Sequence, residues 1–265
     1  MAERVKIAIK DYVAEVSLAR PDKMNALDRE MFEALAAAGT SLKGRKDVRA
    51  VVLYGQGDNF CAGLDTSRFA ELAASMDQVR HNLLNPPEGE AANAFQKPCT
   101  VWQDLDVPVI AALKGVVYGG GAQLALAADF RLAAPDIRMS IMESKWGLVP
   151  DMGLTQSLWK LLRADQAKEL IMTARILDAG EAADLGLVTR LEADPLTAAR
   201  AMAANLVARS PEAIQRAKRL VEDTWHAPSG AGLKREAELQ SRIIGSPNQI
   251  EAVMANIQKR KPDFT

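Results

Sequence analysis

The sequence predicts an α/β fold with a largely parallel sheet and a helical C-terminal region. Short apolar runs that end in glycine alternate with segments of helical spacing, a pattern typical of βα units. Strand signals almost disappear after Val188, where helical patterns take over. The chain has 265 residues, of which 48% are hydrophobic, enough for one large α/β domain, with or without a smaller appendage.

The chain is expected to begin with a β-hairpin. Val5, Ile7 and Ile9 recur at every second position, and residues 13–18 form a second strand-like run. Residues 10–12 are placed to turn the chain between these two strands.

Further strands and a helix follow the hairpin. The stretch "RPDKMNALD" reads as a loop, and apolar side chains at helical spacing from Met31 to Leu42 predict a helix. Three apolar runs, "VRAVVLYG", "VPVIAALKG" and "DFRLAAP", predict buried strands. Residues 66–97 are irregular and are interpreted either as a lid or pocket wall, or as a plain surface excursion.

Two Ser-Pro pairs mark helix starts near the C-terminus. In Ser210-Pro211 and Ser246-Pro247, serine is expected as the N-cap and proline as the first helical residue. We therefore divide the chain into a core of residues 1–190 and a C-terminal helical region of residues 191–265.

Composition limits the classes of binding partner and the cellular compartment that are expected. A net charge of −1 argues against a general nucleic-acid binder. The two cysteines, Cys61 and Cys99, make no disulfide framework, so a reducing compartment is expected. No apolar segment reaches the length of a membrane span, and the N-terminus lacks a secretory core. We expect a cytoplasmic protein with no nucleic-acid or membrane partner.

Common catalytic motifs are absent from the sequence. "GGGAQL" has Leu124 where the dinucleotide fingerprint needs its third glycine, and no P-loop, GxSxG or HExxH sequence occurs. The cysteines lack metal-ligand spacing, and His81 and His226 are far apart, so no metal site is expected. A Cys/His nucleophile pair is an alternative, but each histidine reads better as a surface or lid residue. Chemistry is therefore expected to depend on carboxylates and backbone dipoles.

Two glycine-containing loops each follow a predicted strand. They are "FCAGLD", residues 60–65, and "VVYGGGAQL", residues 116–124. Each can expose backbone N–H groups at a helix N-terminus, where unpaired N–H groups and the helix dipole favour negative charge. Two such donors aimed at one point would form an oxyanion hole. The alternative, favoured on spacing alone, is that the glycines serve only tight turns and packing.

Several stretches together resemble the crotonase (enoyl-CoA hydratase/isomerase) superfamily. "RPDKMNAL", "NFCAGLD", "GVVYGGGAQLALAADFRLA", "MESKWGLVPDMGLTQSL", "ILDAGEAADLGLV" and "IQKRKPDF" resemble its motifs in this order and spacing. The resemblance implies a crotonase-like superhelix of ββα units, with residues 191–265 as a trimerisation region. It also implies homotrimers, often paired into hexamers, and acyl-CoA thioester substrates with no further cofactor.

The resemblance also assigns the oxyanion donors. They would be the backbone N–H groups of Leu64 and Gly120, with the thioester oxygen between them. That oxygen becomes an enolate oxygen when the adjacent carbon loses its proton. The resemblance thus explains the glycine run: without a Cβ, its backbone can come close to the thioester oxygen of the ligand.

The acids distinguish the reactions of the superfamily. Its hydratases carry two glutamates; the first position here is Gln123, which cannot exchange a proton at neutral pH, and the second is Glu143. Asp151 matches an aspartate of dienoyl-CoA isomerases, although those enzymes have another aspartate where this chain has Gln123. Two of three acids match, so the acid pattern is closest to dienoyl-CoA isomerases.

Each of these residues has a structural alternative. Glu143 could be a surface acid, and Gln123 a polar filler on a helix. Asp151 could be the N-cap of a helix expected through "LTQSLWKLL", a position that would lower the pKa of its carboxyl.

The resemblance implies that main chain around "KMNAL" and "CAGLD" holds the adenine and pantetheine of CoA. Gln123 is added because its amide can orient a water or a carbonyl. Lys259 would reach CoA phosphates, either in its own subunit or in a neighbouring one; a solvated basic tail is the alternative. The candidate ligand contacts are Lys23, Met24, Ala26, Ala62, Leu64, Gln123 and Lys259. Asp65 is expected to fix turn geometry.

The resulting hypothesis is an acyl-CoA isomerase that shifts a double bond in enoyl- or dienoyl-CoA. Leu64 and Gly120 would stabilise an enolate, Glu143 would be the main base and Asp151 the partner acid, and the sequence does not set their order of action. The first alternative is an enoyl-CoA hydratase that uses Glu143 with a Gln123-bound water. An alternative of another class is a non-catalytic crotonase fold that binds CoA or a protein.

Overall fold

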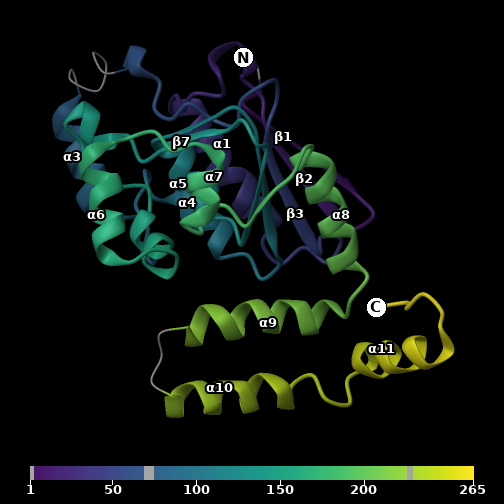
Figure 1. Cartoon of the computed structure of the whole chain (residues 1–265). Helices are drawn as coiled ribbons and strands as arrows, with labels where there is room; N and C mark the ends of the chain where they lie inside the picture. Colours follow the sequence, from purple (N-terminus) through teal and green to yellow (C-terminus); the bar gives the residue numbers. More distant parts are fainter. Residues whose placement is uncertain (1–2, 69–74, 226–228) are drawn as a thin grey trace.

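The computed structural model describes residues 3–68, 75–225 and 229–265 (Figure 1). Its strands are β1 (Val5–Lys10), β2 (Val13–Leu18), β3 (Ala50–Gly55), β4 (Val109–Leu113), β5 (Val116–Tyr118), β6 (Phe130–Ala133), β7 (Arg138–Ser140) and β8 (Arg190–Leu191). Its helices are α1 (Arg29–Leu42), α3 (Met76–Leu84), α4 (Lys97–Gln103), α5 (Gly120–Leu126), α6 (Ala164–Thr173), α7 (Ala179–Asp184), α8 (Pro195–Val207), α9 (Pro211–Thr224), α10 (Ser229–Ser241) and α11 (Pro247–Gln258). Short 3-10 turns are η1 (Pro21–Lys23), η2 (Thr66–Arg68), η3 (Glu143–Trp146), η4 (Leu154–Gln156) and η5 (Leu158–Lys160).

A central sheet organises the described chain. Its strand order is β1-β2-β3-β4-β6-β8. β1 and β2 form the predicted antiparallel hairpin, while β2, β3, β4, β6 and β8 pair in parallel. The carboxyl ends of the parallel strands therefore meet at one edge, the usual place for ligand sites in such sheets. The loops that follow β3 and β4 leave the sheet at this edge.

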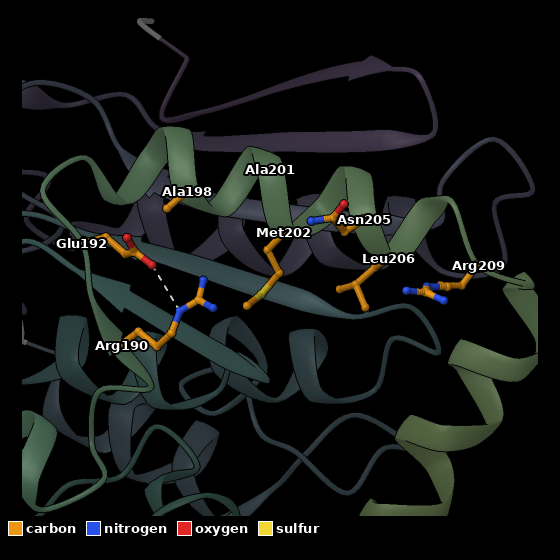
Figure 2. Close-up of a pocket in the computed structure, with 8 residues that line it drawn as sticks. All are labelled: Arg190, Glu192, Ala198, Ala201, Met202, Asn205, Leu206 and Arg209. Atoms are coloured by element: carbon orange, nitrogen blue, oxygen red, sulfur yellow. Dashed lines mark ion pairs between the residues drawn. The ribbon is translucent and has the colours of Figure 1, made fainter. Parts of the chain in front are cut away.

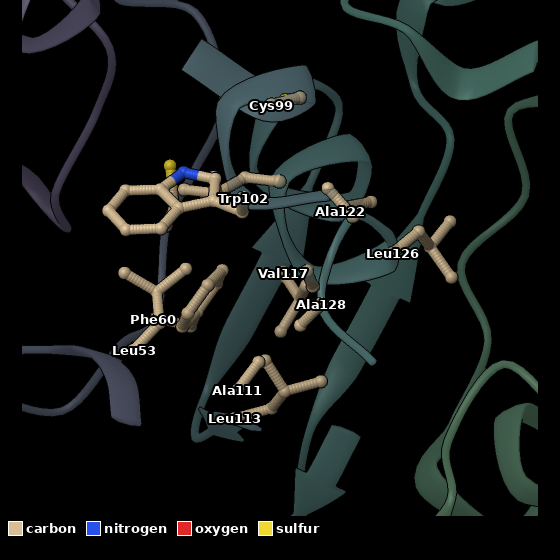
Figure 3. Packing of buried hydrophobic residues seen from close by; sticks show 14 of the residues in the cluster. Leu53, Phe60, Cys99, Trp102, Ala111, Leu113, Val117, Ala122, Leu126 and Ala128 are labelled. Atoms are coloured by element: carbon tan, nitrogen blue, oxygen red, sulfur yellow. The ribbon is translucent and has the colours of Figure 1, made fainter. Parts of the chain in front are cut away.

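The main core lies between the sheet and the helices α1, α4 and α5. Trp102 and Phe60 are fully buried there, packed with Leu53 and Val117 (Figure 3). The Trp102 indole N–H donates to the Pro98 carbonyl at 2.8 Å, so its one polar atom is also satisfied. Helix α8 covers the opposite face of the sheet (Figure 1), where its small residues pack against strands β3 and β4.

A second, smaller ladder starts at the carboxyl edge. β5 pairs in parallel with β7, and single bridges extend this pairing on both sides. Cys61 bridges to Val117, and Leu64 bridges to Leu27. The ladder thus joins the loop after β3 to the segment after β4, although these lie more than fifty residues apart in the chain.

Helices α9, α10 and α11 extend from the body that contains the sheet (Figure 1). Lys218 of α9 is nearly buried and donates to Asp129 at 2.8 Å and to the Val107 carbonyl at 3.1 Å, which anchors this helix to the body. Many apolar side chains of this region are exposed in the single chain: Val221, Trp225, Leu233, Ile250, Val253 and Ile257. These helices therefore present apolar surface outward.

Most predicted elements are confirmed. The hairpin, the three later strands and the helix after "RPDKMNALD" all form. Both Ser-Pro pairs start helices: Ser246 Oγ accepts from the Gln249 N–H at 3.3 Å, whereas the Ser210 hydroxyl donates to Glu212 instead. Of the expected lid, residues 69–74 lie outside the described residues, and the rest contains η2, α3 and the start of α4.

The helix predicted through "LTQSLWKLL" is wrong. Gly153 has a positive φ of 86°, and the chain continues as the short turns η4 and η5. These turns close with bonds between residues three apart, such as Gln156 N–H to Gly153 O, while Leu154 and Leu158 are both buried. Tertiary packing of the two leucines overrides the helical spacing.

Within the described ranges, no helix is both long and apolar enough to cross a bilayer.

Candidate active site

Two loops meet at the carboxyl edge of the sheet. The Cys61 N–H donates to Val116 O at 3.1 Å, and the Tyr118 N–H donates to Cys61 O at 3.0 Å. A Cβ added at Gly63, where φ is 82°, would lie only 2.6 Å from the Tyr118 carbonyl oxygen and 3.4 Å from the Gly120 nitrogen. Glycine at position 63 therefore lets the two loops approach each other.

The backbone N–H groups of Leu64 and Gly120 donate no hydrogen bond to any part of the chain that the structure describes. At Leu64 the reason is the bridge to Leu27, which uses the Gly63 carbonyl and the Asp65 N–H and leaves the N–H between them unused. At Gly120 the reason is that α5 begins there, so no preceding turn supplies an acceptor. Both predicted oxyanion donors thus lack a hydrogen-bond partner within the described chain.

The glycine run also serves the packing of the chain itself. A Cβ at Gly121 would lie 2.4 Å from the Cys61 carbonyl oxygen, and one at Gly120 would lie 2.7 Å from side-chain atoms of Leu27 and Met152. The expectation that the glycines are needed only for the approach of a ligand is therefore incomplete. Protein atoms already require the close approach at these two positions.

Glu143 lies beside this run. It begins η3, it is only 9% exposed, and its Oε1 is 3.4 Å from where a Cβ on Gly119 would stand. Its Oε2 is buried and has no hydrogen-bond partner among the described residues. Burial raises the pKa of Glu143, while the hydrogen bond from Gln123 lowers it and the nearby Asp151 raises it. The alternative of a surface acid is wrong, because the carboxyl is buried.

Gln123 uses both ends of its amide inside the protein. Its Nε2 donates to Glu143 Oε1 at 2.7 Å, and its Oε1 accepts from the Met152 N–H at 2.9 Å. The partners fix the orientation of the amide, because a carboxylate needs a donor and an N–H needs an acceptor. Gln123 is therefore no mere filler, and a direct contact between its side chain and a substrate stays a prediction.

Asp151 lies in the loop between η3 and η4. It is not a helix cap, because no helix starts there and the residue before η4 is Gly153. Desolvation raises the pKa of the Asp151 carboxyl, the opposite of what a helix N-terminus would do. The residue is nevertheless exposed to solvent, so it sits among protein atoms at a surface that a ligand can reach.

An ion pair that the sequence interpretation missed holds the first loop. Arg20 donates to Asp65 Oδ2 at 2.7 Å and to the Ala26 carbonyl at 3.1 Å, with both charged side chains mostly shielded from solvent. Asp65 Oδ1 accepts from the N–H and hydroxyl of Ser67. The bonds from Ser67, and then those from Arg20, lower the pKa of Asp65 to about 2. The sequence did contain a signal for this pair, because Asp65 directly follows Leu64 and Arg20 begins the motif "RPDKMNAL".

Asn25 is a second residue that the sequence interpretation missed. It is fully buried with a positive φ of 54°, and its side-chain nitrogen donates to the carbonyls of Gln56 and Asn59. Its Oδ1 accepts from the Arg20 N–H at 2.9 Å. Asn25 thereby ties the "KMNAL" loop to the turn after β3. A buried asparagine in a polar loop gives no distinct sequence signal.

Most of the expected ligand contacts come together. The Ala62 N–H donates to Met24 O at 2.9 Å, and the Ala26 N–H donates to Lys23 O at 3.0 Å, so the "KMNAL" and "CAGLD" segments lie side by side. Lys259 is not part of this group in one chain. It is exposed and directly follows α11, in the helices that extend from the body (Figure 1).

The cysteines and histidines form no catalytic pair in the described chain. Burial raises the pKa of the Cys61 thiol to about 12 and that of Cys99 well above its usual range, which disfavours the thiolate of either. His81 is exposed on α3 beside Asn85, and His226 lies outside the described residues. The described ranges contain no group of three or more His, Cys, Asp or Glu arranged to hold a metal ion.

Two cavities lie away from these residues. One, of about 390 Å³, lies along α8 and is lined by Arg190, Met202, Leu206 and Arg209 among others (Figure 2). The other, of about 450 Å³, lies between α9 and the C-terminal end of α5. Neither is lined by Glu143, Gly120 or Leu64.

Comparison with known proteins shows the family to which the chain belongs. Residues 8–265 match the family model described as Enoyl-CoA hydratase/isomerase. The chain belongs to the enoyl-CoA hydratase/isomerase family. A probable enoyl-CoA hydratase of Mycobacterium tuberculosis is 31% identical over 99% of this chain and 98% of its own length. A carnitinyl-CoA dehydratase of Salmonella enteritidis is 32% identical over 99% of this chain and 98% of its own length.

Solved structures agree with this membership. A putative enoyl-CoA hydratase from Streptomyces coelicolor is 33% identical, with a TM-score of 0.88 over 99% of this chain and 94% of that one. An enoyl-CoA hydratase from Polaromonas gives a TM-score of 0.87 at 28% identity, over 98% of this chain and 99% of that one. The predicted crotonase fold is confirmed. An acyl-CoA thioester substrate is consistent with the family.

The Arg20–Asp65 pair generates a stability prediction. Asp65→Asn should lower the free energy of unfolding at neutral pH by roughly 1–3 kcal/mol, because it removes charged hydrogen bonds in a shielded site. Since the folded-state pKa is depressed to about 2, the contribution is present above the unfolded value near 3.8 and is lost as pH falls from about 4 to about 2. Urea unfolding at several pH values measures this.

The exposed pair Arg45–Asp47 supplies the control for that experiment. Its N–O distance is 2.5 Å, but both side chains are well exposed, so solvent screens the pair and Asp47→Asn should change stability little. An Asp65→Asn variant as stable as the parent at neutral pH, or one whose deficit persists undiminished at low pH, contradicts the assignment.

Proposed function

We propose that this member of the family shifts a carbon–carbon double bond in an enoyl- or dienoyl-CoA through an enolate. The observation that carries the proposal is the unpaired Oε2 of Glu143, buried beside the glycine run that holds one of two unbonded N–H groups. A carboxylate can accept a proton there, and N–H donors that converge on one oxygen can stabilise it as it becomes negative.

Glu143 acts first in the proposed reaction. Its carboxylate removes a proton from C2 of a 3-enoyl-CoA, and the electron pair of the broken C–H bond moves into the thioester carbonyl. The N–H groups of Leu64 and Gly120 stabilise the enolate oxygen; loss of one such donor costs roughly 3–4 kcal/mol in other enzymes. Glu143 then returns the proton at C4, so the double bond moves to C2–C3 without a change of composition.

Asp151 extends this chemistry to a conjugated diene. Its raised pKa lets the carboxyl keep a proton at higher pH than an ordinary aspartic acid does. Protonation of the extended enolate at C6, rather than C4, requires a second acid away from Glu143. We assign that role to Asp151, which lies in a separate loop linked to Glu143 through the Gln123 amide.

Hydration is the second candidate reaction. It is favoured by the relatives, among them the probable enoyl-CoA hydratase of Mycobacterium tuberculosis and the carnitinyl-CoA dehydratase of Salmonella enteritidis. It needs one group to activate water and another to protonate C2. The amide of Gln123 can serve neither purpose, and its two ends already have protein partners, which is why we place isomerisation first.

The proposed reaction predicts exchange at C2. In heavy water, the protein should incorporate deuterium into a 3-enoyl-CoA and move its double bond, and Glu143→Gln should lower this rate by at least about a hundredfold because the base is lost. Asp151→Asn should affect a 3,5-dienoyl-CoA far more than a monoene. Mass spectrometry and ultraviolet absorbance follow both events.

Several outcomes separate the candidate functions. Hydration of crotonyl-CoA that depends on Glu143, without exchange of the 3-enoyl substrate, selects the hydratase. Acyl-CoA binding detected by thermal shift, with neither reaction, supports the non-catalytic interpretation. Glu169→Gln, an exposed acid on α6, is the matched control and should leave the rates unchanged.

The pH dependence follows from the raised pKa of Glu143. The base form is the ionised carboxylate, so the exchange rate should fall as pH is lowered through the pKa. Because burial raises that pKa, the fall should be centred above the 4.5 of an ordinary glutamate. A rate that stays constant down to the pH of acid unfolding contradicts this assignment.

We also propose that the chain forms a homotrimer, or a hexamer made of two such trimers. The support is the apolar surface on α9, α10 and α11 together with the family membership. In a trimer, Lys259 can contact the CoA phosphates held by a neighbouring subunit. Sedimentation equilibrium should give three or six chain masses; a monomer at micromolar concentration contradicts the proposal.

A further inference from the structure

The hydrogen-bond network around Glu143 depends on one neutral side chain. Among the described residues, Gln123 is the single side chain that hydrogen-bonds to the Glu143 carboxylate. The bond engages Oε1 and leaves Oε2 without a partner. Because a bond to one oxygen fixes the rotation of the carboxyl group, it also fixes where the unpaired oxygen points.

The same amide reaches the loop that carries Asp151. Gln123 Oε1 accepts from the N–H of Met152, the next residue in the chain. The Met152 side chain is itself packed against Gly120, since its sulfur lies 2.7 Å from where a Cβ on that glycine would stand. One side chain on α5 thus connects the carboxylate in η3, the Asp151 loop and the start of α5.

Few other side chains can perform this double role. An amide donates and accepts while neutral, whereas an ionised carboxylate only accepts and an apolar side chain does neither. Gln123 is 2% exposed, so water cannot easily replace a lost partner. The identity of residue 123 therefore decides how the carboxylate and the loop are held.

We propose that Gln123 is a positioning residue, which aims Oε2 of Glu143 at the substrate and holds the Asp151 loop in register with it. This inference rests on the proposed function for its effect on rate. It differs from the expectation that Gln123 binds the substrate, because the amide acts here through Glu143 and Met152.

Few groups in the described chain affect the titration of the Glu143 carboxyl. The ionisable ones are Asp151 in the following loop and the Cys99 thiol of α4, and backbone hydrogen bonds at Glu143 and Met142 lower the pKa of Glu143 less than the Gln123 side chain does. α5 has no ionisable side chain, α6 meets η3 through the Ser144 hydroxyl and the Met172 carbonyl, and Lys145 lies over the Trp146 ring. A change at residue 123 should therefore appear directly in the titration of Glu143.

Gln123→Met tests the loss of both hydrogen bonds at similar volume. Without the donor, Glu143 should titrate at higher pH than in the parent, and the rising limb of the exchange rate should move with it. The kcat for C2 exchange should fall by about 10- to 100-fold, as expected for losing a hydrogen bond to a charged group, while KM changes less than about threefold. Gln156→Met, an exposed glutamine on η4, is the control.

Gln123→Glu gives a signature that a merely structural role would not produce. The two carboxyls would lie about as close as the present 2.7 Å contact, so they should share one proton over part of the pH range. In that range the new carboxyl at position 123 is protonated and can donate and accept as the amide does. The variant should therefore be active in the pH range where one proton is shared, and its activity should fall at higher pH. The exchange rate of the parent should rise with pH in a single step, whereas that of Gln123→Glu should give a bell-shaped pH profile.

The readouts keep this inference separate from the proposed function. Carbon-13 NMR of glutamate-labelled protein, with Glu143 assigned by its absence in Glu143→Gln, reports the titration even if the parent catalyses no exchange. A parent protein without C2 exchange would overturn the proposed isomerase function. The titration of Glu143 would still test whether Gln123 positions the carboxylate. A Glu143 titration, kcat and pH profile unchanged in Gln123→Met would overturn the positioning role, as would a single-limb profile in Gln123→Glu. If Gln123→Met does not fold, the Gln123→Glu profile decides.

Discussion

The candidate site depends on the contact between two loops at the carboxyl edge of the parallel sheet. The bonds that link Cys61 with Val116 and Tyr118 are backbone bonds, and Gly63 allows the close approach. This contact brings the loops that carry the N–H groups of Leu64 and Gly120 together and leaves both groups unbonded in the described chain. Because the donors are main-chain groups, the fold itself, and not a choice of side chain, supplies them.

Burial and the neutral amide of Gln123 are the main influences on the ionisation of the two acids in the candidate site. Desolvation raises the pKa of both Glu143 and Asp151, which disfavours two ionised carboxylates near each other. At Glu143 the amide of Gln123 opposes this most, since it donates to that carboxylate, whereas at Asp151 only a backbone hydrogen bond does so. The two acids are thereby given different environments, which is the condition for one to act as a base and the other as an acid.

The residues that support the Leu64 loop include an ion pair. Arg20 joins Asp65 to the "KMNAL" segment, and Asn25 joins that segment to the turn after β3. Both residues hold the backbone beside the Leu64 loop in place. The C-terminal helices are attached differently, through Lys218, and their exposed apolar side chains suit contact with another chain.

The sequence by itself determined the order of most elements along the chain, the two glycine loops and the acids, because periodicity, glycine and carboxyl groups are local properties. It also carried the family resemblance through its motifs. Only the tertiary structure decided that "LTQSLWKLL" forms two short turns, that Gly120 and Gly121 pack against the chain itself, and that Asp151 caps no helix. It alone showed the partners of Gln123 and the role of Arg20. These depend on contacts between residues 20 to 45 positions apart, which no local pattern specifies.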